Sequence, residues 1–364
     1  MRATRVEATD FRNLERLDLG LPGEGAVLLG PNGQGKTNLL ELIYYPVLFR
    51  SLRGARDQDL VRHGAPAFHG RLHLERSTGS HSVEAGYATT GRRKRIAVDG
   101  AVPERMVDAL GLWLAVAFLP TDVGLVAGGA SERRQYLDRV LALSSSAYLT
   151  ALRRYRAAVE QRNAALRRNE PDAAWAFDPL VARYGAVVVR ERLDWVARFA
   201  GEWTSGCAEL GEPMPVTLRY RGRAELAEVE AWTPLLLAQR GRDRALGATS
   251  LGPHRDDLIF ELDDHPLRVA GSTGQQRTAA IALKLCERDT LAAAHGQPPA
   301  LLLDDVFAEL DRGRQERLAA RLAGPGGQVF ISAPRLDELP DGLGLPIIEV
   351  EAGRAVRLTE RRAA

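Results

Sequence analysis

Apolar and polar positions change their spacing several times along the chain, and each spacing predicts a different kind of element. Short, mostly apolar runs predict three buried strands of one sheet, at residues 26–29, 300–303 and 328–332. Partial alternation predicts one or two strands over residues 1–21. Further short strands joined by glycine turns are predicted at residues 71–75, 81–87 and 96–98. Strand-rich regions are therefore expected toward both ends of the chain.

The middle of the chain has a helical pattern instead. Over residues 131–169 apolar residues recur mostly three, four or seven positions apart, and residues 180–203 predict a second helix. Together these segments predict a helical hairpin inserted between two sheet regions. Other elements are expected nearby: helices at residues 38–43, ended by Pro46, and at 226–239, and strands at 213–220 and 258–262.

The length of the chain favours two lobes, because 364 residues exceed what one hydrophobic core usually serves. The order of the predicted elements places one lobe at residues 1–119 plus 246–364 and a helical insertion at 120–245. A hydrophobic content of 45% and a charged content of 26% are typical of a soluble globular protein. The expected fold class is α/β, with one mixed-sheet lobe and one inserted, largely helical lobe.

The charge balance excludes a protein that is basic throughout. The net charge is +2, so any nucleic-acid surface must be a local patch. One candidate patch is the turn cluster Arg92, Arg93, Lys94 and Arg95. Another is the segment 131–170, which has nine arginines and four acids. Each would suit DNA phosphates. A cluster such as 92–95 is more often a solvated hairpin tip, and packing of charged surface helices explains the segment 131–170 equally well.

Cysteines and hydrophobic runs indicate the compartment. Cys207 and Cys286 cannot form a disulfide framework, which fits a reducing cytosol. The first ten residues include Arg5, Glu7 and Asp10 and have no apolar signal core. The uncharged run at residues 109–119 is too short to span a bilayer. We therefore expect a cytoplasmic protein without a membrane partner.

The most informative motif lies between the first buried strand and the helix after it. Residues 30–37 have the spacing G-x-x-x-x-G-K-[ST] of a phosphate-binding loop. Its glycines let backbone N–H groups surround phosphates, Lys36 would reach the β and γ phosphates, and the Thr37 hydroxyl would ligate Mg²⁺. The expected nucleotide contacts are Gly30, Pro31, Asn32, Gly33, Gln34, Gly35, Lys36, Thr37 and Asn38.

A second motif supplies the acids that such a loop requires. The strand at 300–303 ends in Asp304 and Asp305. A carboxylate at a strand end usually holds the metal of a phosphate-binding loop, which assigns Mg²⁺ to Asp304 together with Thr37. Asp305 is placed to orient and polarise an attacking water, so Asp305 and Lys36 are the expected catalytic residues.

A third motif, at residues 271–277, precedes an apolar helix expected from 278 to about 294. Its small residues offer N–H groups, a hydroxyl and the positive end of the helix dipole, which suit a γ-phosphate. Because the first loop already binds phosphates, a second one is useful if it serves the nucleotide of another protomer.

These motifs together resemble those of a known family. Ser272-Thr273-Gly274-Gln275-Gln276 is similar to the signature of ABC ATPases, and residues 308–311 resemble their D-loop, which contains Asp311. Within that superfamily the chain resembles the RecF family, relatives of SMC heads. The stretches that carry this resemblance are FRNL at 11–14, GPNGQGKTNLLE at 30–41, LGPHRDD at 251–257 and LLLDDVFAELD at 301–311.

The resemblance implies an ABC-ATPase-like head that forms a head-to-tail dimer around ATP. Ser272, Gly274 and Gln275 of one chain would close on the ATP held by the other. It also implies binding to double-stranded DNA, with single/double-strand junctions as a further candidate substrate. Other implied roles are recombinational repair, replication-fork maintenance and recombinase loading with a RecR-type mediator. Transporters usually have Glu where this chain has Asp305, so a weak, slow DNA-dependent ATPase is expected.

One point and two alternatives stay open. Transporters and SMC heads carry a histidine after the next strand, where this chain has Ser332, so the residue that contacts the γ-phosphate there is undetermined. An ABC transporter energy subunit is one alternative, although the signature lies far beyond Lys36. An SMC-like structural ATPase is the other, although a helix at 180–203 would be only about 36 Å long.

Overall fold

The three apolar runs form β3 (Gly25–Leu29), β11 (Ala300–Asp304) and β12 (Val329–Ala333), which lie side by side in one sheet. The structure is a computed structural model and describes residues 1–322 and 326–358. The six strands run in the order β14-β13-β3-β12-β11-β7, all parallel except β14. The other strands are β7 (Ala115–Phe118), β13 (Ile347–Glu351) and β14 (Arg354–Arg357). The carboxyl ends of β3, β11 and β12 therefore share one edge.

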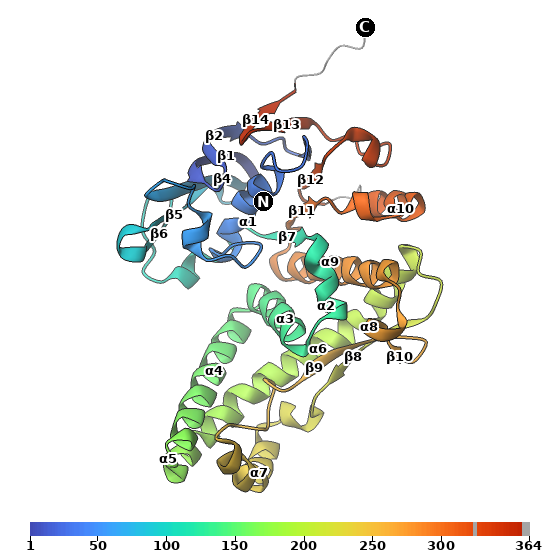
Figure 1. Cartoon of the computed structure of the whole chain (residues 1–364). Coiled ribbons are helices and arrows are strands. Elements are labelled where there is room, and N and C mark those ends of the chain that lie inside the picture. Colours follow the sequence, from blue (N-terminus) through green and yellow to red (C-terminus); the bar gives the residue numbers. More distant parts are fainter. Residues whose placement is uncertain (323–325, 359–364) are drawn as a thin grey trace. The chain divides into compact units, whose positions relative to one another are not determined.

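A second, antiparallel sheet has the order β2-β1-β4-β5-β6. Its strands are β1 (Arg2–Phe11), β2 (Leu14–Gly20), β4 (Ala67–Arg76), β5 (Gly79–Ala88) and β6 (Arg93–Val98). Helix α1 (Lys36–Leu48) contacts strands of both sheets (Figure 1). The rings of Phe11, Tyr45 and Phe68 pack edge to face in this core, with centroids 5.2–6.3 Å apart.

Helix α1 corrects one expectation. Pro46 does not end the helix but lies inside its last turn. A proline there removes a single backbone hydrogen bond close to the helix end, and the surrounding residues of α1 are buried between the two sheets, so packing holds the turn together.

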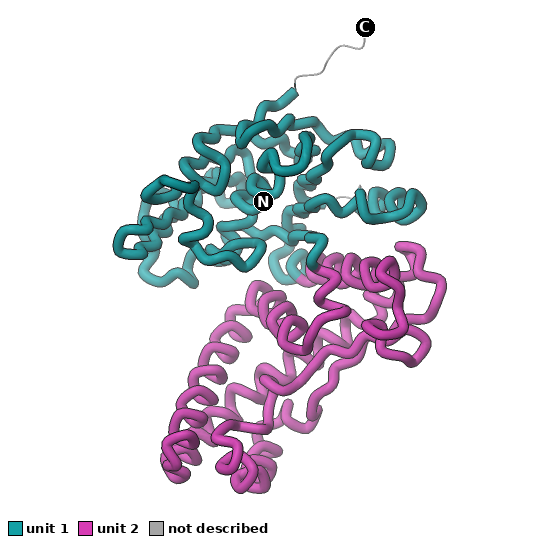
Figure 2. Tube along the Cα trace, viewed as in Figure 1, with its two compact units in different colours: residues 1–121, 291–364 teal, residues 122–290 magenta. Residues whose placement is uncertain are grey.

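The chain divides into two units (Figure 2). Unit 1 comprises Met1–Thr121 and Leu291–Ala364 and holds both sheets described above, with α10 (Arg312–Leu322). Unit 2 comprises Asp122–Thr290. It continues beyond residue 245, where the sequence-based insertion ended, because β8 (Val216–Arg221) pairs with β9 (Asp257–Leu262) and joins both segments in one sheet.

Unit 2 is largely helical, with one small sheet of order β10-β9-β8. Its longest helices are α4 (Ser146–Arg167) and α6 (Asp178–Glu209), which pack against each other (Figure 1). The remaining elements are α2 (Gly124–Ala127), α3 (Ala130–Ser144), α5 (Pro171–Trp175), α7 (Trp232–Leu246), β10 (His265–Pro266), α8 (Leu267–Ala270) and α9 (Thr273–His295), whose last residues belong to unit 1.

A buried ion cluster holds three helices of unit 2 together. The Arg162 side chain on α4 is fully buried, and its Nε lies 2.9 Å from Asp178 of α6 while its Nη1 lies 2.8 Å from Asp243 of α7. Arg162 therefore stabilises the packing of these helices and is not available as a surface charge.

Throughout residues 1–322 and 326–358, each helix is too short or too polar to cross a membrane.

Candidate nucleotide-binding and ATPase site

The glycine-rich loop connects the end of β3 to the start of α1. Gly33 and Gly35 have φ angles of 83° and 115°, in the left-handed region that glycine adopts readily. A Cβ on Gly35 would lie 2.8 Å from Oδ1 of Asn13, so a side chain there would have to displace Asn13. Because the cap residue of α1 is this glycine, no side chain covers the first N–H groups of the helix, which suits an anion.

Lys36 lies within this loop. Its side chain is almost fully buried, and Nζ donates to the carbonyls of Gly30 at 2.6 Å and Pro31 at 3.1 Å and to Oδ1 of Asn32 at 3.3 Å. These oxygens hold the ammonium group at the concave side of the loop. The charge is thus positioned where phosphates would enter.

Thr37 links the loop to the acidic end of β11. Its hydroxyl lies 2.8 Å from Oδ1 and 3.0 Å from Oδ2 of Asp304. The two residues are 267 positions apart in the chain and meet because β3 and β11 flank β12 in the parallel sheet. The pair predicted from separate motifs is therefore adjacent in the structure.

Ser332, at the end of β12, connects both acids. Its hydroxyl accepts from the backbone N–H of Asp305 at 2.9 Å and lies 2.8 Å from Oδ1 of Asp304 and 3.0 Å from Oδ1 of Asp305. Asp305 has a φ of 49°, a conformation that costs energy for a residue with a side chain. Ser332 is buried, and its hydrogen bonds favour this strained conformation.

The electrostatics of the site suit a metal with oxygen ligands. Burial raises the pKa of Asp304, the neighbouring charge of Asp305 raises it further, and hydrogen bonds from Thr37 and Ser332 oppose the shift. A cation would stabilise the charged form of this desolvated carboxylate. A hydroxyl and a carboxylate fit Mg²⁺, which takes its other ligands from phosphates and water. No group of three or more His, Cys, Asp or Glu side chains that could hold a metal ion occurs in the described part of the chain.

Gln34 and Asn38 support the loop. Oε1 of Gln34 accepts from the backbone N–H of Ala352 at 2.7 Å, and Nδ2 of Asn38 donates to Oδ1 of Asn13 at 2.7 Å. Both side chains therefore connect the loop to neighbouring segments. Their contact with the nucleotide stays a prediction. Because both side chains are already engaged, that contact would have to come from their backbone atoms or from a rearrangement of the side chains.

A buried carboxylate beside the loop is a feature that the motifs did not reveal. Glu41 is fully buried on α1 and lies 3.0 Å from Nε of Arg12, 2.7 Å from Nη2 of Arg53 and 2.5 Å from Oγ of Ser51. Burial would raise the pKa of Glu41, but hydrogen bonds from Arg53, Arg12 and Ser51 outweigh it and lower the pKa. The sequence did contain one indication of this cluster, a single acid within the apolar run 39–43. A buried charge needs a partner, so such an acid predicts an ion pair.

Arg53 also reaches the loop helix. Its Nη2 donates to Oδ1 of Asn38 at 2.7 Å, and its side chain is 39% exposed. The segment that follows α1 therefore contributes a cation at the edge of the loop.

The signature residues form the start of α9 in unit 2. The Ser272 hydroxyl accepts from the backbone N–H of Gln275 at 3.3 Å, and the Gln275 side chain accepts from the backbone N–H of Ser272 at 2.8 Å. This reciprocal pair is a capping arrangement that fixes the first helical turn. Ser272 is exposed and Gly274 is half-buried, so the turn is accessible from solvent.

Asp311 occupies the residue before α10 in unit 1. Its Oδ1 accepts from the backbone N–H of Arg314 at 3.0 Å, which is the geometry of a helix N-cap. Its side chain is 60% exposed, so most of the carboxylate faces solvent.

The basic cluster predicted at 92–95 is divided by the structure. Lys94 Nζ donates to the Phe49 carbonyl, lies 3.0 Å from Oδ2 of Asp57 and stands 5.0 Å from the Tyr45 ring. Arg92, Arg93 and Arg95 are exposed. Lys94 therefore packs against α1 and the segment after it. A role in DNA contact stays a prediction for the cluster as a whole. The basic segment 131–170 likewise contains buried, paired arginines, Arg133 and Arg162.

No protein-family model matches the chain. A curated protein of Anaeromyxobacter sp. (strain Fw109-5), named DNA replication and repair protein RecF, is 39% identical over 366 residues, which cover 97% of this chain and 98% of that protein. The chain belongs to the RecF family. The resemblance drawn from the motifs is thereby confirmed.

Two solved structures extend the comparison. A structure described as the recombination mediator protein RecF with ATP in the RecFOR pathway has a TM-score of 0.88 and 29% identity, and covers 98% of each chain. A Pyrococcus furiosus Smc head has a TM-score of 0.62 and 14% identity over 98% of this chain and 96% of that one, which shows a shared fold only. The predicted fold class, an α/β ABC-ATPase-like head with a mixed-sheet lobe and an inserted, largely helical lobe, is therefore confirmed.

Proposed function

We propose that this RecF-family chain is an ATP-driven DNA-binding protein of recombinational repair and replication-fork maintenance. The observation that carries the proposal is the contact between Thr37 and Asp304, because it joins the phosphate loop to the acid that holds the metal in P-loop ATPases. The names of the relatives, a DNA replication and repair protein and a recombination mediator with ATP, support the cellular role.

Within the site each residue has a separate task. Lys36 and the N–H groups of residues 30–35 would bind the β and γ phosphates of ATP. Thr37 and Asp304 would hold Mg²⁺, which neutralises charge on the phosphates when it is bound. Asp305 would accept a hydrogen bond from the attacking water and orient it. Its side chain is one methylene shorter than that of glutamate, which favours weak, DNA-dependent hydrolysis that acts as a switch.

The signature turn completes the proposal. Ser272, Gly274 and Gln275 would contact the ATP of a second copy, with Asp311 at the same interface, so ATP would join two chains head to tail. The dimer would hold double-stranded DNA near gaps or single/double-strand junctions and, with a RecR-type mediator, assist recombinase loading. Slow hydrolysis would then separate the chains. The exposure of Ser272 and its place at the start of α9 support this role.

The test is DNA binding measured with and without ATP and Mg²⁺, on duplex, single-stranded and junction substrates, with the oligomeric state followed by light scattering. ATP should strengthen duplex binding by about tenfold and produce a dimer in the same concentration range. Lys36→Ala should lose both responses, because it removes the charge that meets the phosphates. Duplex binding that is equally strong without nucleotide would contradict the proposed coupling.

A further inference from the structure

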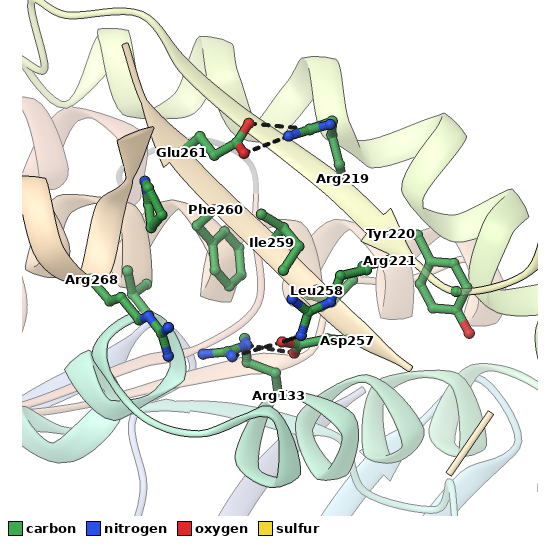
Figure 3. A pocket seen from close by; sticks show the side chains of 13 residues that line it. Arg133, Arg219, Tyr220, Arg221, Asp257, Leu258, Ile259, Phe260, Glu261 and Arg268 are labelled. Carbon is green, nitrogen blue, oxygen red and sulfur yellow. Dashed lines mark hydrogen bonds and ion pairs between the residues drawn. The ribbon is translucent and has the colours of Figure 1, made fainter. Parts of the chain in front are cut away.

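The arginines of unit 2 differ in whether an acid already neutralises them. In the hollow of about 470 Å³ beside β8 and β9, Arg133 and Arg221 both pair with Asp257, and Arg219 pairs with Glu261 (Figure 3). These ion pairs hold α3 and β8 against β9. The charges of these three arginines are therefore used within the protein.

A groove with a different charge balance runs along α4, on the side that faces the start of α3 and the loop 249–257. It consists of two hollows of about 180 and 270 Å³, which adjoin because Tyr155, Arg156 and His254 line both. His254 belongs to the LGPHRDD stretch, which the proposed nucleotide site does not use. Its Nε2 donates to the Thr249 carbonyl at 2.9 Å and its Nδ1 lies 2.6 Å from the Tyr155 hydroxyl, so the loop is fixed against α4. The other polar residues that line this α4 groove include Ser131, Arg134, Gln135, Asn163 and Arg167.

One acid serves two arginines in the α4 groove. The buried Asp138 lies 2.6 Å from Nη2 of Arg192 and 2.7 Å from Nη2 of Arg156. The Arg192 side chain is also buried, whereas that of Arg156 is 60% exposed. A single carboxylate neutralises one positive charge, so one charge remains and Arg156 presents it to solvent.

Two further arginines of the groove form no ion pair. Nη1 of Arg134 donates to the neutral backbone carbonyl of Asp256 at 2.8 Å, while the buried Asp256 carboxylate accepts from the Tyr220 hydroxyl. Arg167 is exposed, and its guanidinium has no hydrogen bond or ion pair with any residue that the structure describes. Of the residues that line the groove, Glu160 is the only exposed acid. Four arginines and two acids thus leave two positive charges in excess.

The accessible groups of the α4 groove are hydrogen-bond donors, not apolar side chains. Leu152, Tyr155 and Val159 line the groove but are only 2–9% exposed, so they offer no surface to an apolar group or a stacked base. Arginine together with hydroxyl and amide side chains is the set that proteins use for nucleic-acid phosphates. Single strands are usually held by stacking on exposed aromatic rings, which the groove lacks among its lining residues. The lining therefore favours the backbone of a duplex.

The positions of the arginines also suit a long polyanion. Arg156 and Arg167 lie on one face of α4, because eleven positions correspond to almost exactly three helical turns. They are about 16 Å apart along the helix axis. A strand of duplex DNA has a phosphate about every 3.4 Å along its axis, so roughly five phosphates pass over this length. A single small anion would reach one end of the row only.

We propose that the α4 groove binds the sugar–phosphate backbone of double-stranded DNA. Arg156 and Arg167 pair with phosphates along one strand, and Arg134 pairs with a further phosphate at the start of α3. The inference rests on the proposed function in taking DNA as the ligand, and it gives unit 2 a contact separate from the cluster at 92–95. Because the contacts are to phosphates, binding does not depend on base sequence.

The test is fluorescence anisotropy of a short labelled duplex of mixed sequence, titrated with the full-length protein in the presence of ATP and Mg²⁺. Arg156→Ala/Arg167→Ala should weaken binding by about tenfold, because two phosphate contacts are lost. For the same reason the slope of log affinity against log salt should fall by about two. ATP-dependent dimerisation, followed by light scattering, should be unchanged, since neither residue lies in the proposed nucleotide site.

Three further variants separate contact from misfolding. Arg167→Ala alone breaks no contact of its guanidinium and should weaken duplex binding by about threefold. Glu160→Gln should tighten duplex binding by about two- to threefold, because repulsion between its carboxylate and the phosphates disappears, and loss of structure would not tighten binding. Arg183→Ala/Arg242→Ala is the matched control: it removes two exposed arginines of unit 2 that do not line the groove, so binding should change by less than about twofold.

The possible failures are distinguishable. Duplex binding of wild-type strength in Arg156→Ala/Arg167→Ala would overturn the groove assignment and leave the proposed ATPase function intact. Preferred binding of a single strand that this variant loses, or binding of a polyglutamate peptide that it loses while it keeps the duplex, would overturn the duplex as the ligand of the groove. No duplex binding by the wild type would overturn both proposals. If the wild type binds duplex equally with and without ATP and the variant still binds it more weakly, the groove assignment stands and the proposed coupling to ATP fails.

Discussion

Ser332 is the residue through which the two acids after β11 are connected. One hydroxyl proton can serve only one of the nearby carboxylate oxygens, which lie 2.8 Å away on Asp304 and 3.0 Å away on Asp305, while the oxygen accepts from the Asp305 N–H. The hydroxyl therefore holds Asp305 in its positive-φ conformation and influences both acids. We therefore propose a positioning role for Ser332, at the strand end where the resemblance to transporters and SMC heads implies a histidine.

We expect Ser332→Ala to slow single-turnover ATP hydrolysis by about ten- to a hundredfold, because a carboxylate displaced by a fraction of an ångström no longer orients water well. ATP affinity, measured with a fluorescent analogue, should stay close to that of the wild type because Lys36 and Thr37 are untouched. Ser144→Ala, which removes a helix hydroxyl in unit 2, is the control. A hydrolysis rate equal to that of the wild type in Ser332→Ala would show that Asp305 holds its position without the serine.

At the scale of elements, features encoded by neighbouring residues were predicted from the sequence more completely than features that depend on distant residues. The phosphate loop, its flanking strand and helix, and the strand that ends in Asp304 were predicted because each is encoded within about a dozen residues. The break between α3 and α4 was not predicted, although Ser145 accepts from the backbone N–H of Tyr148 as a helix cap and lies in a run of three serines. The strand β7 was missed because an apolar run alone does not distinguish a strand from a buried helix segment.

Non-local pairing explains the other differences. The boundary of unit 2 depends on the pairing of β8 with β9, and the inward position of Lys94 depends on Asp57, which is 37 positions away. The ion pairs of Glu41 similarly join α1 to Arg12 at the end of β1 and to Arg53 in the following segment. No periodicity in the sequence shows such contacts.

The Glu41 cluster leads to a pH-dependent prediction. The pKa of Glu41 in the folded protein lies below the ordinary value of 4.5, so the ion pairs stabilise the fold fully above pH 4.5 and lose this contribution as the pH falls through the lower, folded-state pKa. Glu41→Gln should cost about 2–3 kcal/mol near neutral pH, because two arginines lose a buried partner. Urea unfolding should show this difference at pH about 7 and a smaller one at pH about 3.5. A difference that does not change with pH would mean that the charge of Glu41 contributes nothing.

At the scale of the whole molecule, the proposed phosphate loop, metal-binding acid and water-orienting acid all lie in unit 1, whereas the proposed signature turn lies at the start of α9. Each half of the proposed site is well ordered by its own hydrogen bonds. Lys36 is held by three oxygens of its loop, and Ser272 is held by its reciprocal cap with Gln275. Two preformed halves on one chain are what a head-to-tail pair of chains would require.

A mixing experiment tests whether the site is shared between chains. Lys36→Ala should fail to bind ATP, and Ser272→Arg should bind ATP but remain a monomer, because a bulky cation replaces the hydroxyl at the proposed interface. Mixed together with ATP, the two variants should associate, since one of the two sites then combines an intact loop from the Ser272→Arg chain with an intact signature from the Lys36→Ala chain. Light scattering with one chain carrying a larger tag would identify the mixed pair. If Ser272→Arg alone forms a normal ATP-dependent dimer, or if the mixture stays monomeric while the wild type dimerises, the two halves do not meet across chains as proposed.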